Sequence, residues 1–558
     1  MKSKNMVLVF GILAVVVFGV TFGVVMITQN SGKNREAMDP EAAARKLDSL
    51  YARLTVNKPA PRQDPNYQGT DAGAEQIAVL PDISEYPFIV NPTTDNFLTV
   101  YSSIEKAGWL ADAANKFNQS GATVGGLPVS VGIRAVSSGV GADFISSGKY
   151  TPDVYAPASE IYGNMLTGQG VKAALIEKRL AGNVTGIVIA KKKNDELTGK
   201  YGALNMKAII DSVLSGSLAL GYTSPLTDED GFNFILTLLS AFDSANPESD
   251  ASITQLRQFQ DKIPLISYDN DQLQASLTGG ILDGIVLNYQ TYANSPGLQS
   301  AYAFTPIGVR QDNPVYEIGD LPAIKQQITT QFTDFCKNAD SQKSASDRGF
   351  NGQDSYAGET VMDGASILQA QDIYKKEKNG SSDLTAVFVA DISGSMEGSP
   401  LLNLKASLNR AIGVIDSNAN VGLVTFSDQV NIVAPIAKFD SMQKSYFSYA
   451  VKSMSVGGGT AMYDAVVVAQ KMLMDAKTRN PNTKTMLFVL TDGESNRGYT
   501  FDDIKSMTQG IRIPVYTIGY NANIDALKAL SDINEAATMN ADTDNVIYRI
   551  QSLFNAQM

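Results

Sequence analysis

Short apolar runs rich in β-branched residues alternate with amphipathic stretches along most of this chain. The runs at residues 98–101, 128–133, 285–287 and 384–390 are bounded by turn residues, as buried strands are. Between such runs, apolar residues recur at the three- and four-residue spacing of helices. Alternating strands and helices are typical of parallel sheets covered by helices, so we predict an α/β fold.

The clearest strand-to-helix connection follows the run at residues 384–390. The loop Asp391-Ile392-Ser393-Gly394-Ser395-Met396 comes next, and helical spacing resumes after it. A second unit repeats this arrangement later in the chain, where the run at 485–490 leads into Thr491-Asp492-Gly493. Between the two, Gly457-Gly458-Gly459-Thr460 precedes another helix. Because the carboxyl ends of parallel strands share one edge of the sheet, we expect the three loops to meet there.

The side chains of these loops offer only oxygen donors. Asp391 and Asp492 supply carboxylates, and Ser393, Ser395 and Thr460 supply hydroxyls. Oxygen-only ligation suits Mg²⁺, Mn²⁺ or Ca²⁺, and the small number of carboxylates leaves room for water, which favours Mg²⁺. The alternative is that Asp391 and Ser393 only bind loop and helix-start amides, as short polar side chains often do. Three such loops in this order favour the metal site.

At these residues the sequence resembles the von Willebrand factor type A domain and its metal-ion-dependent adhesion site. The family pattern is Asp-x-Ser-x-Ser, then a distant Thr, then a distant Asp, and it falls on Asp391, Ser393, Ser395, Thr460 and Asp492. The resemblance implies that the three hydroxyls contact the ion more directly, while the two aspartates often act through water. It also implies a protein partner that completes the metal shell with an acidic residue.

Composition narrows the classes of function. The 558 residues are 44% hydrophobic and 18% charged, as in ordinary globular proteins, and the length predicts more than one domain. The net charge of −12 argues against nucleic acid as a partner. The absence of histidine excludes His-based triads and His-ligated zinc. The single cysteine, Cys336, excludes an intramolecular disulfide, and we expect it to be an inert core residue.

An uncharged apolar run covers Met6 to Ile27. At about 1.5 Å per residue it spans about 33 Å, enough to cross the hydrocarbon core of a bilayer. We predict a transmembrane anchor within residues 1–27 and a single-pass cell-membrane protein whose bulk lies outside the cytoplasm. Residues 28–95 are polar and rich in proline, so we expect a stalk. One short helix within it, with an apolar stripe that includes Leu47 and Leu50, is expected to dock on the next domain.

Residues 96–375 repeat a second pattern, in which apolar strands end in small hydroxyl residues and a helix follows. Such hydroxyls and the amides of the following helices can together hold an anion or a polar solute. The alternative for each residue is an ordinary helix cap. The run Asp228-Glu229-Asp230-Gly231 lacks the later Glu of a calcium loop, so a turn is the better interpretation. The candidate solute-binding residues are Ser102, Ser103, Ser137, Ser138, Ser159, Thr223, Ser224 and Tyr289.

This region resembles the two-lobed extracellular solute-binding proteins of bacteria. The matching segments include Thr99-Val100-Tyr101-Ser102-Ser103, Ser137-Ser138-Gly139, Tyr222-Thr223-Ser224-Pro225 and Asn288-Tyr289-Gln290. The resemblance implies two α/β lobes joined by a hinge, with an unknown small solute held between them.

The patterns together predict a transmembrane helix, a two-lobed α/β domain and, at residues 382–558, a doubly wound type A domain. The function they favour is non-enzymatic recognition of a small solute and of a protein partner. One alternative is a receptor for an ABC-type importer that docks through the type A domain. Another is a hydrolase, since oxygen-bound Mg²⁺ can also serve catalysis. Against a hydrolase, the sequence shows no nucleophile–base pair and no paired carboxylates of acid–base spacing.

Overall fold

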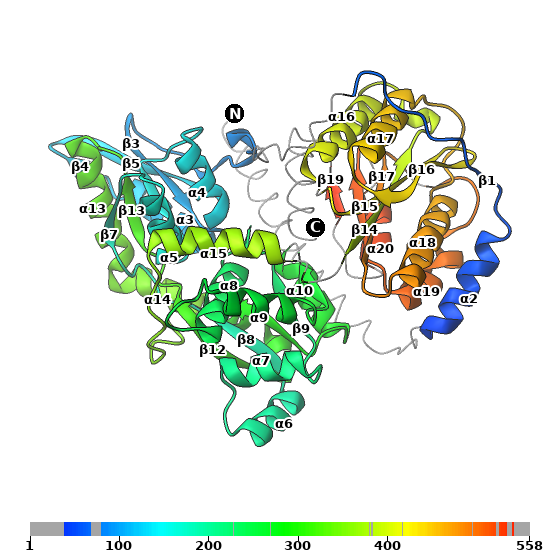
Figure 1. Cartoon of the computed structure of the whole chain (residues 1–558). Coiled ribbons are helices and arrows are strands. Elements are labelled where there is room, and N and C mark those ends of the chain that lie inside the picture. Colours follow the sequence, from blue (N-terminus) through cyan, green and yellow to red (C-terminus); the bar gives the residue numbers. More distant parts are fainter. Residues whose placement is uncertain are drawn as a thin grey trace.

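The computed structural model describes residues 38–67, 80–226, 228–267, 269–378, 380, 383–415, 417–493, 495–520, 524–532 and 538–540. They form two units, each built from sheets with helices on their faces (Figure 1). The unit from residue 80 to residue 378 contains two sheets, and each sheet forms the centre of one lobe. The third sheet belongs to the C-terminal unit.

The first lobe is built on a sheet in the order β2-β5-β3-β6-β13-β7, with β4 paired to β5. β3 runs parallel to β5 and β6, whereas β13 runs antiparallel to β6 and β7. Its strands are β2 (Phe88–Val90), β3 (Asn96–Ser102), β4 (Thr123–Val124), β5 (Leu127–Ala135), β6 (Val154–Ala156), β7 (Ala173–Glu177) and β13 (Val315–Ile318). Its helices are α3 (Ile104–Gln119), α4 (Ser138–Ser147), α5 (Glu160–Gly168), α13 (Ala323–Lys337) and α14 (Ala339–Asp347), and a 3₁₀ turn, Ile83–Glu85, precedes β2.

The second lobe has a five-stranded sheet in the order β10-β9-β11-β8-β12. β8 runs antiparallel to both β11 and β12, so the sheet is mixed. The sequence predicted a parallel sheet, and it could not show the difference because buried apolar runs do not reveal strand direction. Its strands are β8 (Val184–Ala190), β9 (Leu220–Thr223), β10 (Leu265–Ser267), β11 (Gly284–Asn288) and β12 (Tyr302–Arg310). Its helices are α6 (Lys191–Tyr201), α7 (Met206–Leu214), α8 (Glu229–Phe242), α9 (Asp250–Gln260), α10 (Asn270–Thr278), α11 (Tyr289–Ala293) and α12 (Pro296–Ala301).

The two lobes are packed directly against each other. The chain crosses between them twice, from β7 to β8 and from β12 to β13. Tyr162 of α5 and Phe232 of α8 meet across the junction, with ring centroids 5.9 Å apart. The helix α15 (Gly364–Glu377) lies across both lobes and contacts α5, α8 and α9 (Figure 1). The lobes are therefore held in one closed arrangement by a shared apolar core.

The C-terminal unit has a seven-stranded sheet in the order β1-β16-β15-β14-β17-β18-β19. The central strand β14 is parallel to β15 and β17, and its residues are all buried. The strands are β1 (Val56–Asn57), β14 (Leu384–Asp391), β15 (Asn420–Phe426), β16 (Val430–Lys438), β17 (Lys484–Thr491), β18 (Val515–Gly519) and β19 (Thr538–Asn540). The helices are α16 (Ser399–Val414), α17 (Ser441–Ser453), α18 (Met462–Arg479), α19 (Phe501–Ile511) and α20 (Ile524–Ser531), and a 3₁₀ turn, Gly394–Met396, precedes α16.

Residues 38–67, here called the N-terminal belt, belong to the C-terminal unit. The helix α2 (Pro40–Tyr51) forms where the sequence predicts one, capped by Asp39, but it packs on α18 and α19 and not on the domain that follows it in sequence (Figure 1). β1 then extends the sheet in parallel, with Val56 opposite Val430. Further along, the buried Asp64 accepts a hydrogen bond of 2.7 Å from Ser448 and pairs with Lys452. The two-lobed unit is thus an insertion between two parts of the C-terminal unit.

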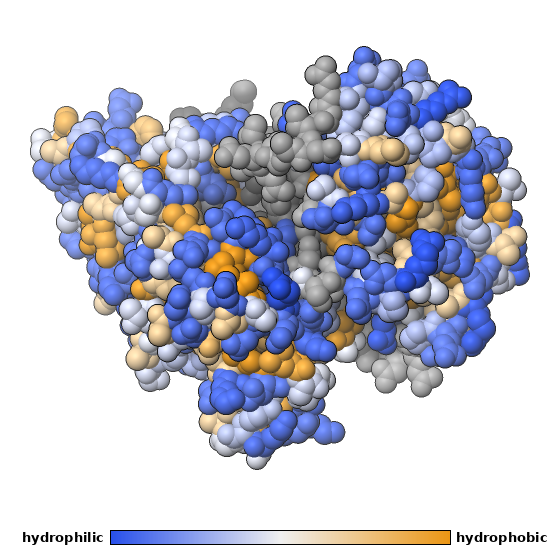
Figure 2. Space-filling view, in the orientation of Figure 1, coloured by the Kyte–Doolittle hydropathy of each residue, from blue (hydrophilic) through white to orange (hydrophobic). Residues whose placement is uncertain are grey.

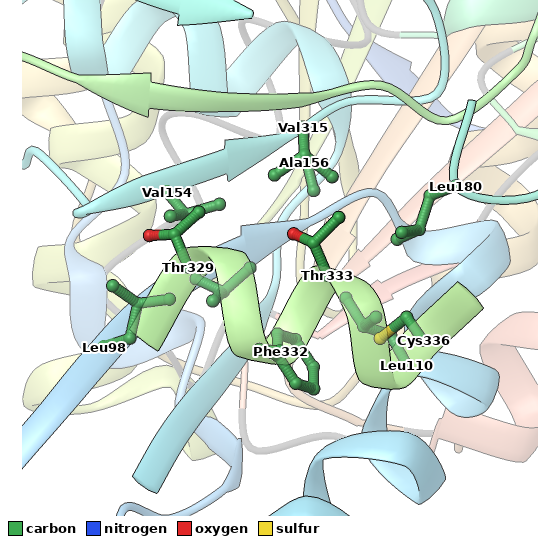
Figure 3. A pocket seen from close by; sticks show the side chains of 11 residues that line it. Leu98, Leu110, Val154, Ala156, Leu180, Val315, Thr329, Phe332, Thr333 and Cys336 are labelled. Atoms are coloured by element: carbon green, nitrogen blue, oxygen red, sulfur yellow. The ribbon is translucent and has the colours of Figure 1, made fainter. Parts of the chain in front are cut away.

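The single cysteine lies in the apolar core of the first lobe. Cys336 is fully buried on α13, and burial raises the pKa of its thiol. A cavity of about 10 Å³ remains beside it, lined by Leu98, Phe332 and other mostly apolar side chains (Figure 3). This volume leaves no room for a solute, which agrees with an inert structural cysteine.

The predicted membrane anchor requires a correction. No helix among the described residues is long and apolar enough to cross a bilayer. The longest of them, α18, has 18 residues and carries charged side chains such as Asp464 and Lys471. The apolar run from Met6 to Ile27 lies outside the described residues. The architecture is therefore a mixed α/β chain with no described transmembrane helix, and the single-pass membrane localisation predicted with it is not retained.

Polar residues cover most of the face seen in Figure 2, with apolar residues interspersed among them. Two exposed apolar side chains lie near the starts of helices that border the candidate sites described below. Ile104 begins α3 in the first lobe, and Leu402 lies in the first turns of α16 in the C-terminal unit.

Candidate functional sites

Three loops meet at the carboxyl edge of the C-terminal sheet. Asp391 ends β14, and Asp492 follows the parallel neighbour β17, so both reach the same edge. The third loop, which contains Thr460, is tied to the first by backbone hydrogen bonds. Gly457 N donates to Ile392 O at 2.9 Å, and Gly394 N donates to Gly458 O at 3.1 Å. The positive φ of Gly458, +81°, explains why glycine is needed in this loop.

A chain of hydrogen bonds connects four of the five predicted metal ligands. The buried Asp391 accepts from Ser393 N through Oδ1 at 2.7 Å and from the Thr491 hydroxyl through Oδ2. The hydroxyls of Ser393 and Ser395 lie 3.0 Å apart. Ser395 Oγ donates to Asp492 Oδ1 at 2.8 Å. Asp391, Ser393, Ser395 and Asp492 therefore form one cluster of oxygen atoms.

Thr460 is held by the loop that follows β17. Its amide donates to Asn496 Oδ1 at 2.9 Å, and its carbonyl accepts from the amides of Asn496 and Arg497. The side chain is 4% exposed, and none of the hydrogen bonds found among the described residues uses its hydroxyl. Arg497 also reaches Asp428, with 3.5 Å between Nε and Oδ1. The backbone of Thr460 is thus fixed while its oxygen stays available.

The chemistry of this cluster fits a hard divalent cation. All five predicted ligands carry oxygen donors, two of them carboxylates. Burial raises the pKa of Asp391 to about 6, although hydrogen bonds from Thr491 and Ser393 oppose the rise. A cation beside Asp391 would favour its ionised form. Across the described residues there is no group of three or more Asp, Glu, His or Cys side chains able to hold a metal, so any ion here depends on the hydroxyls.

A larger cavity opens next to the metal loops. Its volume is about 430 Å³, and Ile392 and Ser455 of the metal-loop region contribute to its wall. Tyr446 and Tyr449 line it from α17, and Arg62 lines it from the N-terminal belt. Arg62 lies 3.4 Å from the Tyr449 hydroxyl, which accepts its hydrogen bond. The belt therefore forms one wall of a cavity beside the candidate metal centre.

The predicted solute-binding hydroxyls are already engaged by protein groups. Ser102 Oγ donates to the Ser103 carbonyl, and Ser103 Oγ accepts from Lys106 Nζ at 2.9 Å. Ser138 Oγ accepts from the Ala158 amide at 3.1 Å. Ser159 caps α5 and donates to the Glu229 carboxylate of the other lobe. Of these hydrogen bonds, the one from Ser159 joins the first lobe to α8 of the second lobe.

The remaining predicted residues are less closely grouped. Thr223 Oγ1 donates to Asp228 Oδ1 at 2.6 Å, and Ser224 Oγ accepts from the Leu226 amide at 3.4 Å. Ser137 begins α4 without a side-chain capping bond. Tyr289 packs its ring edge against Phe304, with centroids 5.2 Å apart, inside the second lobe. Tyr289 therefore contributes to packing in the second lobe, and its ring also lies against the backbone of Gly352, in the segment that follows α14 of the first lobe.

The sequence interpretation assigned no binding role to three charged residues at the junction. Lys106, Glu229 and Asp230 are buried, at 0%, 6% and 2% exposure. Charged side chains are seldom buried in this way unless they are paired or functional. A sequence signal existed, because Asp228-Glu229-Asp230 opens an otherwise apolar helix, yet three consecutive acids also suit an ordinary helix start.

The comparisons with known proteins give one family match, which lies in the C-terminal unit. Residues 386–556 match the family model of the von Willebrand factor type A domain. Inter-alpha-trypsin inhibitor heavy chain H1 of Mesocricetus auratus is 27% identical over 151 residues. That match covers 25% of this chain and 16% of the relative, so this chain spans only a small part of its length.

Two solved structures are each similar to a part of this chain. A von Willebrand factor type A structure from Catenulispora acidiphila matches with a TM-score of 0.28 and 18% identity, covering 31% of this chain and 42% of that one. Iron-bound HitA from Pseudomonas aeruginosa matches with a TM-score of 0.37 and 13% identity, covering 51% of this chain and 99% of that one.

Proposed function

We propose that this chain, whose C-terminal unit is a von Willebrand factor type A domain, is a non-enzymatic recognition protein with two binding sites. The C-terminal unit holds Mg²⁺, with Mn²⁺ or Ca²⁺ as possible substitutes, through Asp391, Ser393, Ser395, Thr460 and Asp492. Through that ion it binds an acidic residue of a protein partner. The two-lobed unit binds a small solute.

The observation that carries the metal proposal is the oxygen cluster at the sheet edge. Its members come from loops far apart in sequence, yet Asp391, Ser393, Ser395 and Asp492 are joined by hydrogen bonds of 3.0 Å or less. When bound, the ion supplies positive charge and an open coordination position for an external carboxylate. The residues of this chain orient one another and exclude bulk water from Asp391, which is fully buried.

The partner proposal draws on the surroundings of the oxygen cluster. Arg497 adds a positive charge at the Thr460 loop, which favours an acidic partner residue. The neighbouring cavity of about 430 Å³, with Tyr446 and Tyr449 in its wall, offers space for an apolar side chain of the same partner. In this proposal, the partner places an acidic residue at the ion and an apolar side chain in the neighbouring cavity.

Thermal unfolding of the full chain tests the metal site. An ion that binds the folded chain only should stabilise it by about 2.7 kcal/mol at a concentration 100 times its dissociation constant. We therefore expect one melting transition to rise with millimolar Mg²⁺ or Mn²⁺. Asp391→Ala should abolish that rise while the circular dichroism spectrum stays folded.

A matched control is Asp475→Ala, because Asp475 is an exposed acidic residue of the same unit that pairs with Lys471 near the end of α18 away from the Thr460 loop. Its Mg²⁺ response should persist. A native chain whose melting is unaffected by both ions across the millimolar range contradicts the metal site. A partner that still binds after chelation contradicts the metal-mediated contact.

A further inference from the structure

Two carboxylate oxygens lie without hydrogen-bond partners where the two lobes meet. Glu229, the first residue of α8, is 6% exposed, and Glu105 lies in the first turn of α3 on the opposite lobe. By hydrogen-bond geometry, neither Glu229 Oε2 nor Glu105 Oε2 has a partner within the described part of the chain, although both atoms are shielded from solvent. Burial raises the pKa of Glu229, and the nearby Ser138 hydroxyl lowers it. A buried carboxylate oxygen without a donor or a cation is costly, so this pair indicates a missing positive group.

The one buried cation of the junction does not supply that group. Lys106 Nζ donates to Ser103 Oγ at 2.9 Å, to the Ala156 carbonyl at 2.6 Å and to the Pro157 carbonyl at 2.9 Å. These three bonds use all the donors of an ammonium group. Burial lowers the pKa of Lys106 and both carboxylates raise it through their charge, but no ion pair within 4 Å joins Lys106 to Glu105 or Glu229 among the described residues, so a direct cationic contact to them is left to another group.

The neighbouring acidic residues are satisfied within their own lobe. Asp230 accepts from Asn288, Gln311 and Thr185, at distances between 2.8 and 3.0 Å. Asp228 caps α8 and accepts from the Thr223 hydroxyl. Both nevertheless add negative charge close to Glu229. Four carboxylates therefore surround a junction that contains one fully used ammonium.

We propose that the junction between the lobes binds a cationic organic solute, with its ammonium or guanidinium group between Glu105 and Glu229. This inference rests on the proposed solute-binding function and names its chemical class. An oxyanion would meet four carboxylates, and the helix starts of α3 and α8 already carry their own acidic side chains. A metal ion is disfavoured, because no three acidic side chains of the described residues, these included, lie close enough together to hold one.

The solute reaches the site from the side of α3. Glu105 is partly exposed, and the adjacent Ile104 is 58% exposed, whereas Glu229 is closed in by Ser159 and the packed lobes. A small ammonium group can approach Glu105 first. A larger body requires the lobes to separate, as in hinge closure around a ligand.

The pH dependence of binding follows from the groups that face Glu229. Burial raises the pKa of Glu229 to about 8, hydrogen bonding by Ser159 lowers it, and the Glu105 carboxylate raises it. Burial also lowers the pKa of Lys106 to about 7. Asp228 and Asp230 on α8 are acidic neighbours, and burial raises their pKa values to about 7 and about 6. The phenols of Tyr155, Tyr162 and Tyr316 on the first lobe also interact with the Glu229 charge.

Deprotonation of Glu229 and deprotonation of Lys106 both favour a bound cation, although their effects on the stability of the folded chain have opposite signs. Without ligand, the folded chain keeps a proton on Glu229 that the unfolded chain releases, so stability from this group falls as pH rises from about 4.5 towards 8. Above that range Glu229 is ionised and Lys106 has lost much of its charge. Affinity for a cation should therefore rise between pH 6.5 and pH 8.5.

Isothermal titration calorimetry on the full chain tests the proposal. The probes are putrescine, agmatine, spermidine and arginine, compared with sulfate, phosphate and glucose. We expect at least one amine to bind more tightly at pH 8.5 than at pH 6.5. Glu105→Gln should weaken that binding about tenfold or more, because a charge-assisted hydrogen bond is lost.

Glu160→Gln is the matched control. Glu160 also lies in the first turn of a helix of the first lobe, but it pairs with Lys178 at 3.0 Å, so its removal should leave amine binding unchanged. Glu229→Gln should remove both the binding and its pH dependence. Equal weakening by Glu105→Gln and Glu160→Gln would overturn the proposed contact.

The other outcomes separate this inference from the proposed function. Binding of sulfate, phosphate or glucose in place of the amines leaves solute binding standing and overturns the cation assignment. No heat from any of these probes overturns both. The response of melting to Mg²⁺ is measured independently, and none of these results changes it.

Discussion

Single hydrogen bonds orient the side chains in the three loops that form the candidate metal site. Asp391 is fully buried and both of its oxygens accept hydrogen bonds, one from the Ser393 amide and one from the Thr491 hydroxyl. Thr491 is not among the proposed ligands, yet it fixes the orientation of a carboxylate that is. Such supporting donors commonly matter for affinity almost as much as the ligands themselves.

We therefore expect Thr491→Val to weaken Mg²⁺ binding about 10- to 100-fold while the unit stays folded. The measurement is the Mg²⁺ concentration that gives half of the maximal melting shift. Thr385→Val is the control, because Thr385 also loses a buried hydroxyl contact, 2.8 Å to Thr483, but at the opposite end of β14. If both variants respond to Mg²⁺ like the native chain, Thr491 has no part in the site.

The five candidate metal ligands could be proposed from sequence because loop position and oxygen chemistry are both local properties. The solute-binding residues could not be judged in this way. Ser103 and Ser159 lie at the junction, but the Ser103 hydroxyl accepts a hydrogen bond from Lys106, and the Ser159 hydroxyl donates one to Glu229. The sequence interpretation did not select Lys106, and Glu229 is distant from Ser159 in sequence. Hydrogen-bond saturation depends on tertiary contacts, so a pattern of hydroxyls cannot reveal it.

Among the secondary-structure elements, α15 does the most to hold the lobes together. Near its start, Gly364 meets α5 so closely that an added Cβ would lie 2.1 Å from the Asn164 carbonyl oxygen. At its end, Glu377 binds Arg257 of α9 through two hydrogen bonds of 2.7 and 3.0 Å. One helix thus connects the first lobe to the second.

Gly364→Ala should destabilise the two-lobed unit by about 1–3 kcal/mol, because the new methyl group has no space beside α5. The measurement is urea unfolding of the full chain. Gly199→Ala is the control: Gly199 lies in the exposed helix α6 with nothing within 4 Å of the added Cβ, and the change should be neutral or stabilising by about 0.5–1 kcal/mol. Equal effects of the two changes would contradict a tight crossing of α5 and α15.

The belt shows how far periodicity can predict an element. The sequence indicates a helix near residues 40–54 with an apolar stripe, and α2 has that stripe at Ala43, Leu47 and Leu50. The spacing of apolar residues identifies a face but carries no information about its partner. The stripe packs on α18 and α19, whose sequences lie more than four hundred residues later.

At the scale of the whole molecule, the N-terminal belt and the proposed metal site belong to the same folded unit, so we expect them to unfold together. Leu47→Ala should destabilise the C-terminal unit by about 2–5 kcal/mol, because Leu47 is 1% exposed in its core. The melting transition that falls should be the one that Mg²⁺ raises. The control Arg45→Ala changes an exposed side chain of the same helix and should have little effect.

Differential scanning calorimetry with and without Mg²⁺ makes this comparison. If Leu47→Ala lowers the Mg²⁺-independent transition, the belt belongs to the two-lobed unit in solution. The family match begins at residue 386, so sequence comparison alone would leave the belt out of the C-terminal unit.

The pairing of β1 with β16 also sets the order of events during synthesis. Val56 leaves the ribosome long before Val430, its neighbour in the sheet. At about 5–20 residues per second the belt waits on the order of tens of seconds for its docking surface. During that time the apolar face of α2 has no core to join, while the inserted lobes can fold and bring the two distant segments closer together, which reduces the entropic cost of closing the loop. The first residues of the belt are thus among the last to reach their native contacts.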